Sequence, residues 1–312
     1  MDGGIGIIEM MYKTNIFGLV GGGKNPKYTP NKVILWDDYQ TKVLNEFKLT
    51  SSVKNIKLKK DKIIIVCEQR VYVYSTDKYK LIETIETFKN EIGTIGLNTD
   101  ENITVMGFPI NPEGFIKVKY YEKSQETEIN AHTALIYCIS INSDGSLVAT
   151  SSNNGHIIRV FSVENGEFLE EFRRGKEKEN ISHISFDEYS GWMAVCSERG
   201  VIHIFSMGNV WKIAKEKGIE RTKLPEKEEE LPKNETSFLR NLPNFLTRGA
   251  FDGDKSFARV KIEAQPAICG LFPNHDIIAV TSSGKFYYAQ LNSKKGGNCQ
   301  IIKVEDLNQK AK

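Results

Sequence analysis

A short strand-like segment recurs six times along the chain, and its spacing limits the folds that are possible. The six copies are KVILWDD, RVYVYST, FIKVKYY, HIIRVFS, VIHIFSM and KFYYAQL. Aligned at Trp36, Tyr74, Tyr120, Phe161, Phe205 and Ala289, they are separated by 38, 46, 41, 44 and 84 residues. A four-stranded propeller blade occupies about 40 to 45 residues, so the first four intervals each fit one blade. The pattern predicts an all-β, WD40-like β-propeller over residues 1–312, with a long insertion in the fifth visible repeat.

Turn signals divide the fourth repeat into four strands. ALIYCISI, SLVATSS, HIIRVFS and EFLEEFR are separated by Asp144-Gly145, Asn154-Gly155 and Asn165-Gly166. Asx-Gly dipeptides are strong hairpin signals because both residues accept the positive φ angles of tight turns. A β-sandwich would share the alternation of apolar and polar residues, but it would not explain six copies at nearly constant spacing.

The composition excludes several classes of protein. The 312 residues include 42 basic and 40 acidic side chains, and 40% are apolar, which is typical of a soluble folded chain. Because the net charge is only +2, a large basic surface for nucleic acid is not expected. The sequence has no run of about 18 to 20 apolar residues that could cross a bilayer, and no signal peptide. We therefore expect a cytoplasmic protein that touches membranes only peripherally.

The cysteines and the glycine-rich segment carry no catalytic or metal-binding motif. Cys67, Cys138, Cys196, Cys269 and Cys299 are far apart, form no C-x-x-C pair, and are expected to be free thiols. The GGGK run at 21–24 lacks the spacing of a phosphate-binding loop and is expected to form an inter-strand turn. No Ser-His-Asp set or isolated carboxylate pair stands out. We therefore expect no enzymatic activity, no cofactor and no bound metal.

The insertion covers residues 208–254, and its character changes along its length. Between Lys212 and Glu235, fourteen of 24 residues are charged with both signs mixed, which predicts a solvated spacer. The apolar half that follows includes Phe238, Leu239, Leu242, Phe245 and Leu246. Apolar side chains on a surface insertion need a partner, either a membrane or the wall of the propeller itself.

Two adjacent arginines lie where the fourth repeat meets the fifth, in the run Phe172-Arg173-Arg174-Gly175. Adjacent residues of an extended segment point to opposite sides, so Arg173 and Arg174 are expected to serve two separate sites. Each guanidinium can hold a phosphate through two parallel hydrogen bonds. Taken alone, such a pair is also typical of a solvated strand edge.

The sequence around these arginines resembles the PROPPIN family of phosphoinositide-binding β-propellers, whose hallmark is F/L-R-R-G. The run NAHTALIYCISINSDGSLVATSSNNGHIIRVFSVENGEFLEEFRRG contains the Ala-His, A-T-x-S, I-R-V-F and F-R-R-G elements of the family in order. Similar segments are LVGGGKNPKYTPNKVILWDD, GVIHIF, SFARVKI and GGNCQ, so the resemblance covers essentially the whole chain. The GGGKNPKY run is similar to the branch of the family that contains the human WIPI-3 and WIPI-4 proteins.

The resemblance implies two phosphoinositide pockets. The first is formed by His132, Thr150, Ser152, Gly155, Arg159 and Arg173, and the second by Arg174, Gly175, Ser197 and His203. Hydroxyl and imidazole N–H groups can donate to phosphate oxygens and inositol hydroxyls, while arginine supplies fixed charge. Two family threonines are replaced by His156 and Val201 here, and Val201 removes one donor from the second pocket.

Several of these residues also have a structural interpretation. Thr150 and Ser152 can satisfy backbone groups of a strand and a turn, and Arg159 can be an ion-pair partner within the sheet. His203 lies between two isoleucines, as a strand histidine with a satisfied ring would. His132 is similar to the structural histidine of WD-type blades, and this role is compatible with a place in the pocket.

The resemblance also implies a function. We expect an effector that recognises phosphatidylinositol 3-phosphate and phosphatidylinositol 3,5-bisphosphate on autophagic or endolysosomal membranes, with the apolar half of the insertion as a membrane contact. The family implies that it recruits autophagy machinery, including a bridge-like lipid-transfer protein, through segments near Gln69 and Pro109 to Gly114. The protein is expected to be a monomer. The alternative from another class is a propeller scaffold that binds only proteins.

The number of blades is a further expectation. The family has seven blades, six repeats are visible here, and the chain begins at a point that resembles the second blade of the family. The resemblance therefore implies that the first blade is missing from this sequence. An open ring of blades would leave two strand edges unpaired.

Overall fold

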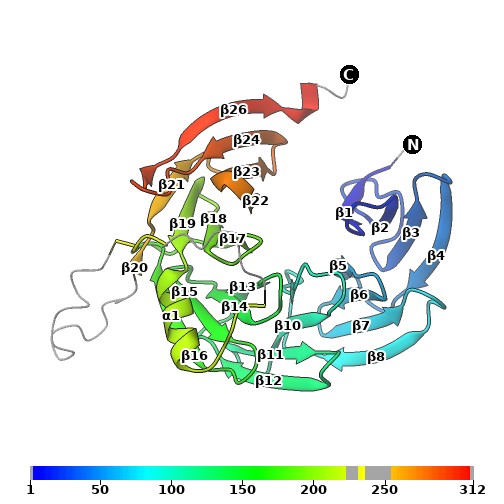
Figure 1. The fold of residues 1–312 in the computed structure, drawn as a ribbon. Helices are drawn as coiled ribbons and strands as arrows, with labels where there is room; N and C mark the ends of the chain where they lie inside the picture. Colours follow the sequence, from blue (N-terminus) through cyan, green and yellow to red (C-terminus); the bar gives the residue numbers. More distant parts are fainter. Residues whose placement is uncertain (1–2, 223–230, 236–253, 310–312) are drawn as a thin grey trace. The chain divides into compact units, whose positions relative to one another are not determined.

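The computed structural model describes residues 3–222, 231–235 and 254–309, which form six sheets of four or five strands (Figure 1). The chain divides into two compact units. One unit contains residues 1–97 and 108–112, and the other contains residues 98–107 and 113–312.

The first unit contains two four-stranded antiparallel sheets. The first sheet has β1 (Ile5–Met10), β2 (Ile16–Gly21), β3 (Lys32–Asp37) and β4 (Lys42–Lys48) in that order. The second has β5 (Val53–Leu58), β6 (Lys62–Cys67), β7 (Arg70–Ser75) and β8 (Leu81–Glu86). Every residue of β6 is buried, because its β-branched run is covered on both faces of the sheet.

The third sheet has β9 (Gly96–Leu97), β10 (Val105–Ile110), β11 (Phe115–Tyr120) and β12 (Gln125–Asn130). The division between the two units falls at this sheet. Lys117 and Lys119 of β11 form ion pairs with Glu126 and Glu128 of β12. Because the Glu126 and Glu128 side chains are 46% and 60% exposed, these ion pairs contribute little to stability.

The second unit contains the remaining three sheets. The fourth has β13 (Ile136–Ile141), β14 (Leu147–Ser152), β15 (Ile157–Ser162), β16 (Phe168–Arg173) and β20 (Asp254–Lys255). The fifth has β17 (Ile181–Phe186), β18 (Trp192–Ser197), β19 (Val201–Ser206), β21 (Ala258–Lys261) and β25 (Gly297–Asn298). The sixth has β22 (Ala267–Phe272), β23 (Asp276–Thr281), β24 (Lys285–Gln290) and β26 (Gln300–Asp306), with short 3₁₀ turns η2 (Pro273–His275) and η3 (Leu307–Gln309).

The six recurring segments of the sequence occupy equivalent places in the six sheets. They correspond to β3, β7, β11, β15, β19 and β24, and each is the third strand of its sheet along the chain. The predicted turns of the fourth repeat are also present, since Gly145, Gly155 and Gly166 have φ angles of 71°, 59° and 72°. These observations confirm the prediction of an all-β fold built from repeated four-stranded sheets.

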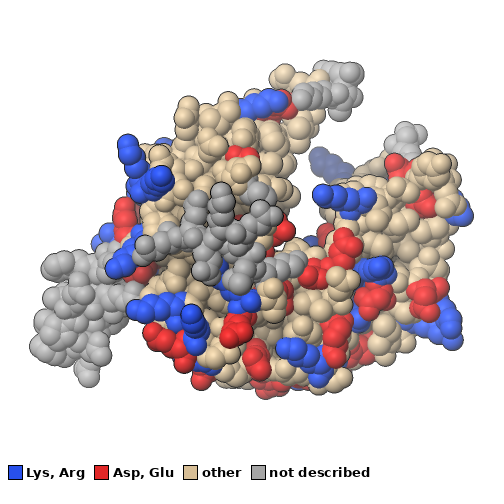
Figure 2. Space-filling model, in the orientation of Figure 1, with Lys and Arg blue, Asp and Glu red and all other residues tan. Residues whose placement is uncertain are grey.

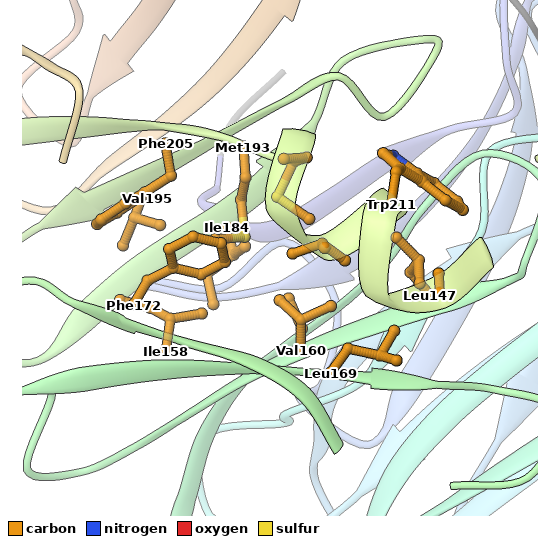
Figure 3. Packing of buried hydrophobic residues seen from close by; sticks show 14 of the residues in the cluster. Leu147, Ile158, Val160, Leu169, Phe172, Ile184, Met193, Val195, Phe205 and Trp211 are labelled. Carbon is orange, nitrogen blue, oxygen red and sulfur yellow. The ribbon is translucent and has the colours of Figure 1, made fainter. Parts of the chain in front are cut away.

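One apolar core lies between the fourth and fifth sheets (Figure 3). It includes Leu147, Ile158, Val160, Leu169 and Phe172 from the fourth sheet and Ile184, Met193, Val195 and Phe205 from the fifth. The rings of Phe172 and Phe205 pack with their centroids 5.0 Å apart. This packing positions the end of β16, at which Arg173 is the last residue and Arg174 is the next.

Helix α1 (Gly208–Glu216) lies at the start of the insertion and overlaps residues 212–216 of the segment predicted to be a solvated spacer. It buries Val210, Trp211 and Ala214 and packs beside β16 (Figure 1). The Trp211 indole N–H donates to the Ser190 carbonyl oxygen at 2.6 Å. Three apolar residues on one helix face are enough to dock the helix, in which three of nine residues are charged.

The prediction that the cysteines are free thiols is confirmed. All five cysteines are free; Cys67, Cys196 and Cys269 are buried, and Cys138 and Cys299 are half-buried. Within the described ranges, no helix has the length and apolar character needed to cross a membrane.

Candidate functional site

Arg173 and Arg174 stand at the junction between the fourth and fifth sheets. Phe172 of β16 points into the core between these sheets, so Arg173 points to the opposite face of the fourth sheet. Arg173 is 9% exposed and pairs in register with Ile157 of β15. Arg174 follows the strand, and its backbone N–H donates to the His156 carbonyl oxygen at 2.9 Å. The two arginines therefore have different neighbours, as the sequence predicts.

The face that carries Arg173 also carries Arg159. Arg159 lies opposite Thr150 on one side and Glu171 on the other. Its Nε donates to Glu171 Oε2 at 2.8 Å, and its Nη1 donates to the Ala131 carbonyl oxygen at 2.8 Å. Arg159 is thus an ion-pair partner within the sheet, which is the structural interpretation that the sequence left open.

His132 and Thr150 form a buried polar pair on the same face. His132 Nε2 lies 3.0 Å from Thr150 Oγ1, and both side chains are buried. Burial, together with the positive charge of Arg159, lowers the pKa of His132 to about 4. The imidazole is therefore neutral at physiological pH, and its hydrogen bond satisfies the threonine hydroxyl.

The turn between β14 and β15 brings together Ser152, Gly155 and His156. Ser152 Oγ accepts a hydrogen bond from the Asn154 N–H at 3.4 Å, so this hydroxyl supports the turn. Gly155 has a φ of 59°, and a Cβ atom there would lie 1.6 Å from the Glu179 carbonyl oxygen. Partial burial and the nearby Arg174 charge lower the pKa of His156, so a protonated His156 requires more acid than an ordinary histidine.

The guanidinium of Arg174 is held by three acceptors of the protein. Nε donates to the Gly155 carbonyl oxygen at 2.8 Å, Nη1 to Glu179 Oε2, and Nη2 to the Glu177 carbonyl oxygen. The side chains of Arg174 and Glu179 are only 7% and 4% exposed. The positive charge of Arg174 is therefore balanced by a buried carboxylate of the same chain.

His203 and Ser197 lie on the face of the fifth sheet that looks toward the fourth. His203 Nδ1 lies 3.1 Å from Ser256 Oγ, and burial with the charges of Arg174 and Arg259 lowers its pKa to about 3. Ser197 is buried, and its hydroxyl donates to the Val201 carbonyl oxygen at 3.2 Å. The hydroxyl thus already has an acceptor within the turn.

The two buried histidines predict a loss of stability in mild acid. In the unfolded chain each takes up a proton near pH 6.5, whereas in the folded protein His132 and His203 stay neutral to about pH 4 and 3. Between pH 6.5 and the pKa of each folded histidine, the unfolded state therefore binds more protons than the folded state. As the pH falls through this range, each histidine lowers the unfolding free energy by up to about 1.4 kcal/mol per pH unit. Urea midpoints measured from about pH 7 to 4.5 should fall, and less steeply in His132→Gln/His203→Gln. An equal slope in the two proteins would contradict this assignment.

Three basic residues beside the site were missed by the sequence analysis. Lys255 of β20 pairs with Arg173, and Arg259 and Lys261 of β21 pair with His203 and Val201. All three are exposed. The alternation of Arg259 and Lys261 with buried apolar residues is the signal that could have placed them on one face.

The ends of the apolar half of the insertion are fixed close to Arg173 and Arg174. The Lys255 N–H donates to the Glu235 carbonyl oxygen at 2.9 Å. The Asn234 side chain exchanges two 2.8 Å hydrogen bonds with the backbone of Ser206. The predicted membrane contacts Phe238, Leu239, Leu242, Phe245 and Leu246 lie outside the residues that the structure describes. The described residues on either side of this apolar segment, Glu235 and Lys255, therefore lie beside β16.

Charge on the surface is mixed. On the face shown in Figure 2, lysine and arginine side chains are interspersed with aspartate and glutamate. Across the part of the chain with described coordinates, no group of three or more His, Cys, Asp or Glu side chains could hold a metal ion.

The comparisons with known proteins identify the family. The PROPPIN family model matches residues 6–308. Autophagy-related protein 18e of Arabidopsis thaliana is 30% identical over 307 residues, which cover 97% of this chain and 76% of the plant protein.

Solved structures agree in fold. Kluyveromyces lactis Hsv2 superposes with a TM-score of 0.72 at 18% identity, covering 97% of this chain and 87% of that one. KlAtg21, solved in complex with the coiled-coil of AgAtg16, has a TM-score of 0.73 at 21% identity, with 96% and 84% covered. The fold is therefore propeller-like, and the chain belongs to the PROPPIN family.

Proposed function

We propose that the protein is a phosphoinositide effector that recognises phosphatidylinositol 3-phosphate and phosphatidylinositol 3,5-bisphosphate. The observation that carries the proposal is the position of the two consecutive arginines. Arg173 lies on one face of the fourth sheet beside the exposed Lys255, and Arg174 lies at the junction with the fifth sheet near His203. Guanidinium and ammonium groups are suited to phosphate monoesters, because each supplies several N–H donors and a fixed charge.

The two sites and the insertion together support membrane binding. The apolar residues Phe238, Leu239, Leu242, Phe245 and Leu246 belong to a segment whose ends are paired beside Arg173. Burial of such side chains in a bilayer contributes about 1.5 to 3 kcal/mol each, less the cost of ordering. Contacts that share one rigid element bind with a high effective concentration, so each can be individually weak.

Arg173→Ala is expected to abolish most binding to vesicles that contain phosphatidylinositol 3-phosphate. The change removes one phosphate ligand, and loss of a charge-assisted bidentate contact costs about tenfold or more in affinity. The measurement is co-sedimentation with phosphatidylcholine vesicles that contain phosphatidylinositol, its 3-phosphate or its 3,5-bisphosphate.

Arg70→Ala is the matched control for this experiment. Arg70 lies on β7, half-exposed, and its pairing with Glu86 is long, at 3.8 Å. The control removes the same charge and should bind as the unchanged protein does. Equal binding of the Arg173→Ala variant, or binding that ignores the headgroup, would reject the proposed function.

A protein-binding scaffold is the second candidate, and two ion pairs favour it. Arg159 is paired with Glu171 and Arg174 with Glu179, so both arginines already stabilise the fold. A scaffold predicts that membrane association is absent in the unchanged protein and in the Arg173→Ala variant alike. The same sedimentation experiment therefore separates the two candidates.

We further propose where the protein acts and what it recruits. Its relatives carry autophagy-related names, and KlAtg21 binds the coiled-coil of AgAtg16. We place this chain on autophagic or endolysosomal membranes, as a monomer of the WIPI-3 and WIPI-4 branch that recruits a bridge-like lipid-transfer protein. Gln69 and residues 111–113 are exposed and suit such a contact, whereas Pro109 and Gly114 are buried.

A further inference from the structure

The Arg174 side chain is 7% exposed and is held by groups of its own chain. Its three nitrogens donate to the Gly155 carbonyl oxygen, the Glu179 carboxylate and the Glu177 carbonyl oxygen. These bonds use three of the five guanidinium N–H groups, and so little of the side chain is exposed that a phosphate can reach it only if these contacts rearrange. A ligand at this residue therefore competes with the contacts that the structure contains.

Glu179 is held in place from two directions. Its Oε1 accepts the Arg199 backbone N–H at 2.7 Å, and its own N–H donates to the Asn154 carbonyl oxygen at 3.1 Å. The first bond ties it to the turn between β18 and β19, and the second ties it to the turn between β14 and β15. Glu179 is thus fixed at the junction between the fourth and fifth sheets, and its side chain is 4% exposed.

We propose that Glu179 is an internal counter-ion that competes with the phosphate of a phosphoinositide headgroup for Arg174. Carboxylate and phosphate oxygens accept the same parallel N–H bonds from a guanidinium, so one can replace the other. Occupation of the second site then requires Arg174 to exchange the carboxylate for the ligand. This inference rests on the proposed function, and it makes Glu179 the residue that sets the affinity of the second site.

The exchange of Glu179 for a phosphate also accounts for the weak starting attraction of the second site, in which Val201 supplies no side-chain donor. Val201 provides no side-chain donor, and Arg174 is balanced by Glu179, so the second site starts with little net attraction for a phosphate. The nearby cations Arg199 and Arg259 can draw a headgroup to the rim without releasing Arg174. Release of the carboxylate is then the step that converts an encounter into tight binding.

Glu179→Gln tests the proposal directly. Glutamine has the same shape and can still accept one hydrogen bond, but it no longer carries the charge that balances Arg174. Affinity for phosphatidylcholine vesicles that contain phosphatidylinositol 3-phosphate should increase about tenfold or more, which is the scale of one charge-assisted hydrogen bond. The gain should vanish when Arg174→Ala is added to Glu179→Gln.

Glu167→Gln is the control. It removes the same charge, but the Glu167 side chain is 45% exposed and pairs with Lys217 rather than with Arg174. Its effect on affinity should be less than about twofold, because an exposed charge is screened. An equal gain in both variants, or no gain in Glu179→Gln, overturns the proposal.

The outcomes separate this inference from the proposed function. If the unchanged protein and Glu179→Gln both fail to bind vesicles, the proposed function fails. If the unchanged protein binds with headgroup selectivity and Glu179→Gln binds equally or more weakly, only the inference fails.

A measurement on the unchanged protein serves if Glu179→Gln does not fold. The Arg199 amide, which donates to Glu179, should exchange its hydrogen faster when soluble inositol 1,3-bisphosphate is added. Unchanged or slower exchange at that amide, with binding demonstrated, overturns the proposal.

Discussion

Arg174→Ala is expected to destabilise the folded protein by about 3–5 kcal/mol, which is the cost of removing one partner from a buried ion pair. The Glu179 carboxylate would remain in a site where its side chain is 4% exposed, without the guanidinium that balances its charge. The Gly155 carbonyl oxygen would lose a donor as well. Urea unfolding followed by circular dichroism measures the change, and the midpoint should shift well below that of the unchanged protein.

Two variants control this result. Arg199→Ala removes an arginine whose side chain is 59% exposed and should change stability by less than about 1 kcal/mol. Arg174→Ala/Glu179→Gln removes the buried charge together with its partner and should recover a large part of the loss. A midpoint for Arg174→Ala equal to that for Arg199→Ala would show that Glu179 tolerates the loss of its partner. The expected loss is also the reason that membrane binding is better tested through Arg173.

Gly155→Ala is expected to cost roughly 2–4 kcal/mol and to disturb the site at its centre. The φ of Gly155 is 59°, which an L-residue adopts only at a cost, and the new Cβ atom would lie 1.6 Å from the Glu179 carbonyl oxygen. The backbone at residue 179 would have to move, and the carboxylate that holds Arg174 would move with it. Thermal unfolding and vesicle sedimentation of the same sample measure both effects.

Gly175→Ala is the matched control for a glycine in the same motif. A Cβ atom at Gly175 would meet no other atom within 4 Å. Its stability should stay within about 0.5 kcal/mol of the unchanged protein. If Gly155→Ala unfolds at the same temperature as Gly175→Ala, the close approach at Glu179 does not constrain the protein.

The repeated sheets could be predicted because their signal is periodic and local. Trp36, Tyr74, Tyr120, Phe161 and Phe205 recur at nearly one blade length, and each falls in the third strand of its sheet. The Asx-Gly turns sit between consecutive strands because their backbone angles match the twist of a hairpin. Period and turn chemistry act over a few residues, so they can be read without knowledge of tertiary contacts.

Helix α1 could not be predicted in the same way. Trp211 and Ala214 are separated by lysine and isoleucine in a charged segment, and only their contact with β16 makes the short helix stable. The average composition of the segment indicated solvent exposure, whereas three buried side chains decide its position. Strand β20 has two residues and gives no recognisable pattern at all.

The partners of the arginines were the main feature of the site that the sequence concealed. Glu171 and Glu179 stand among several charged neighbours, and only the fold shows that they face Arg159 and Arg174. Sequence spacing places residues on a face, but it does not say which of two nearby carboxylates turns inward. The different neighbours of Arg173 and Arg174, in contrast, follow from alternation along a strand, which is a simple rule.

The paired ends of the insertion have a consequence for how such a protein can diverge. Glu235 and Lys255 are joined through their backbones, and Asn234 is tied to Ser206, so both ends are set by the sheet rather than by the residues between them. Once a loop is closed at its base, a change in its length costs little, since the closure entropy grows only slowly. The segment between Glu235 and Asp254 can thus accept insertions, deletions or a complete change of sequence at little cost to the fold. Under the proposed function, a change in this segment would alter the affinity for a lipid surface and leave the two headgroup sites unchanged.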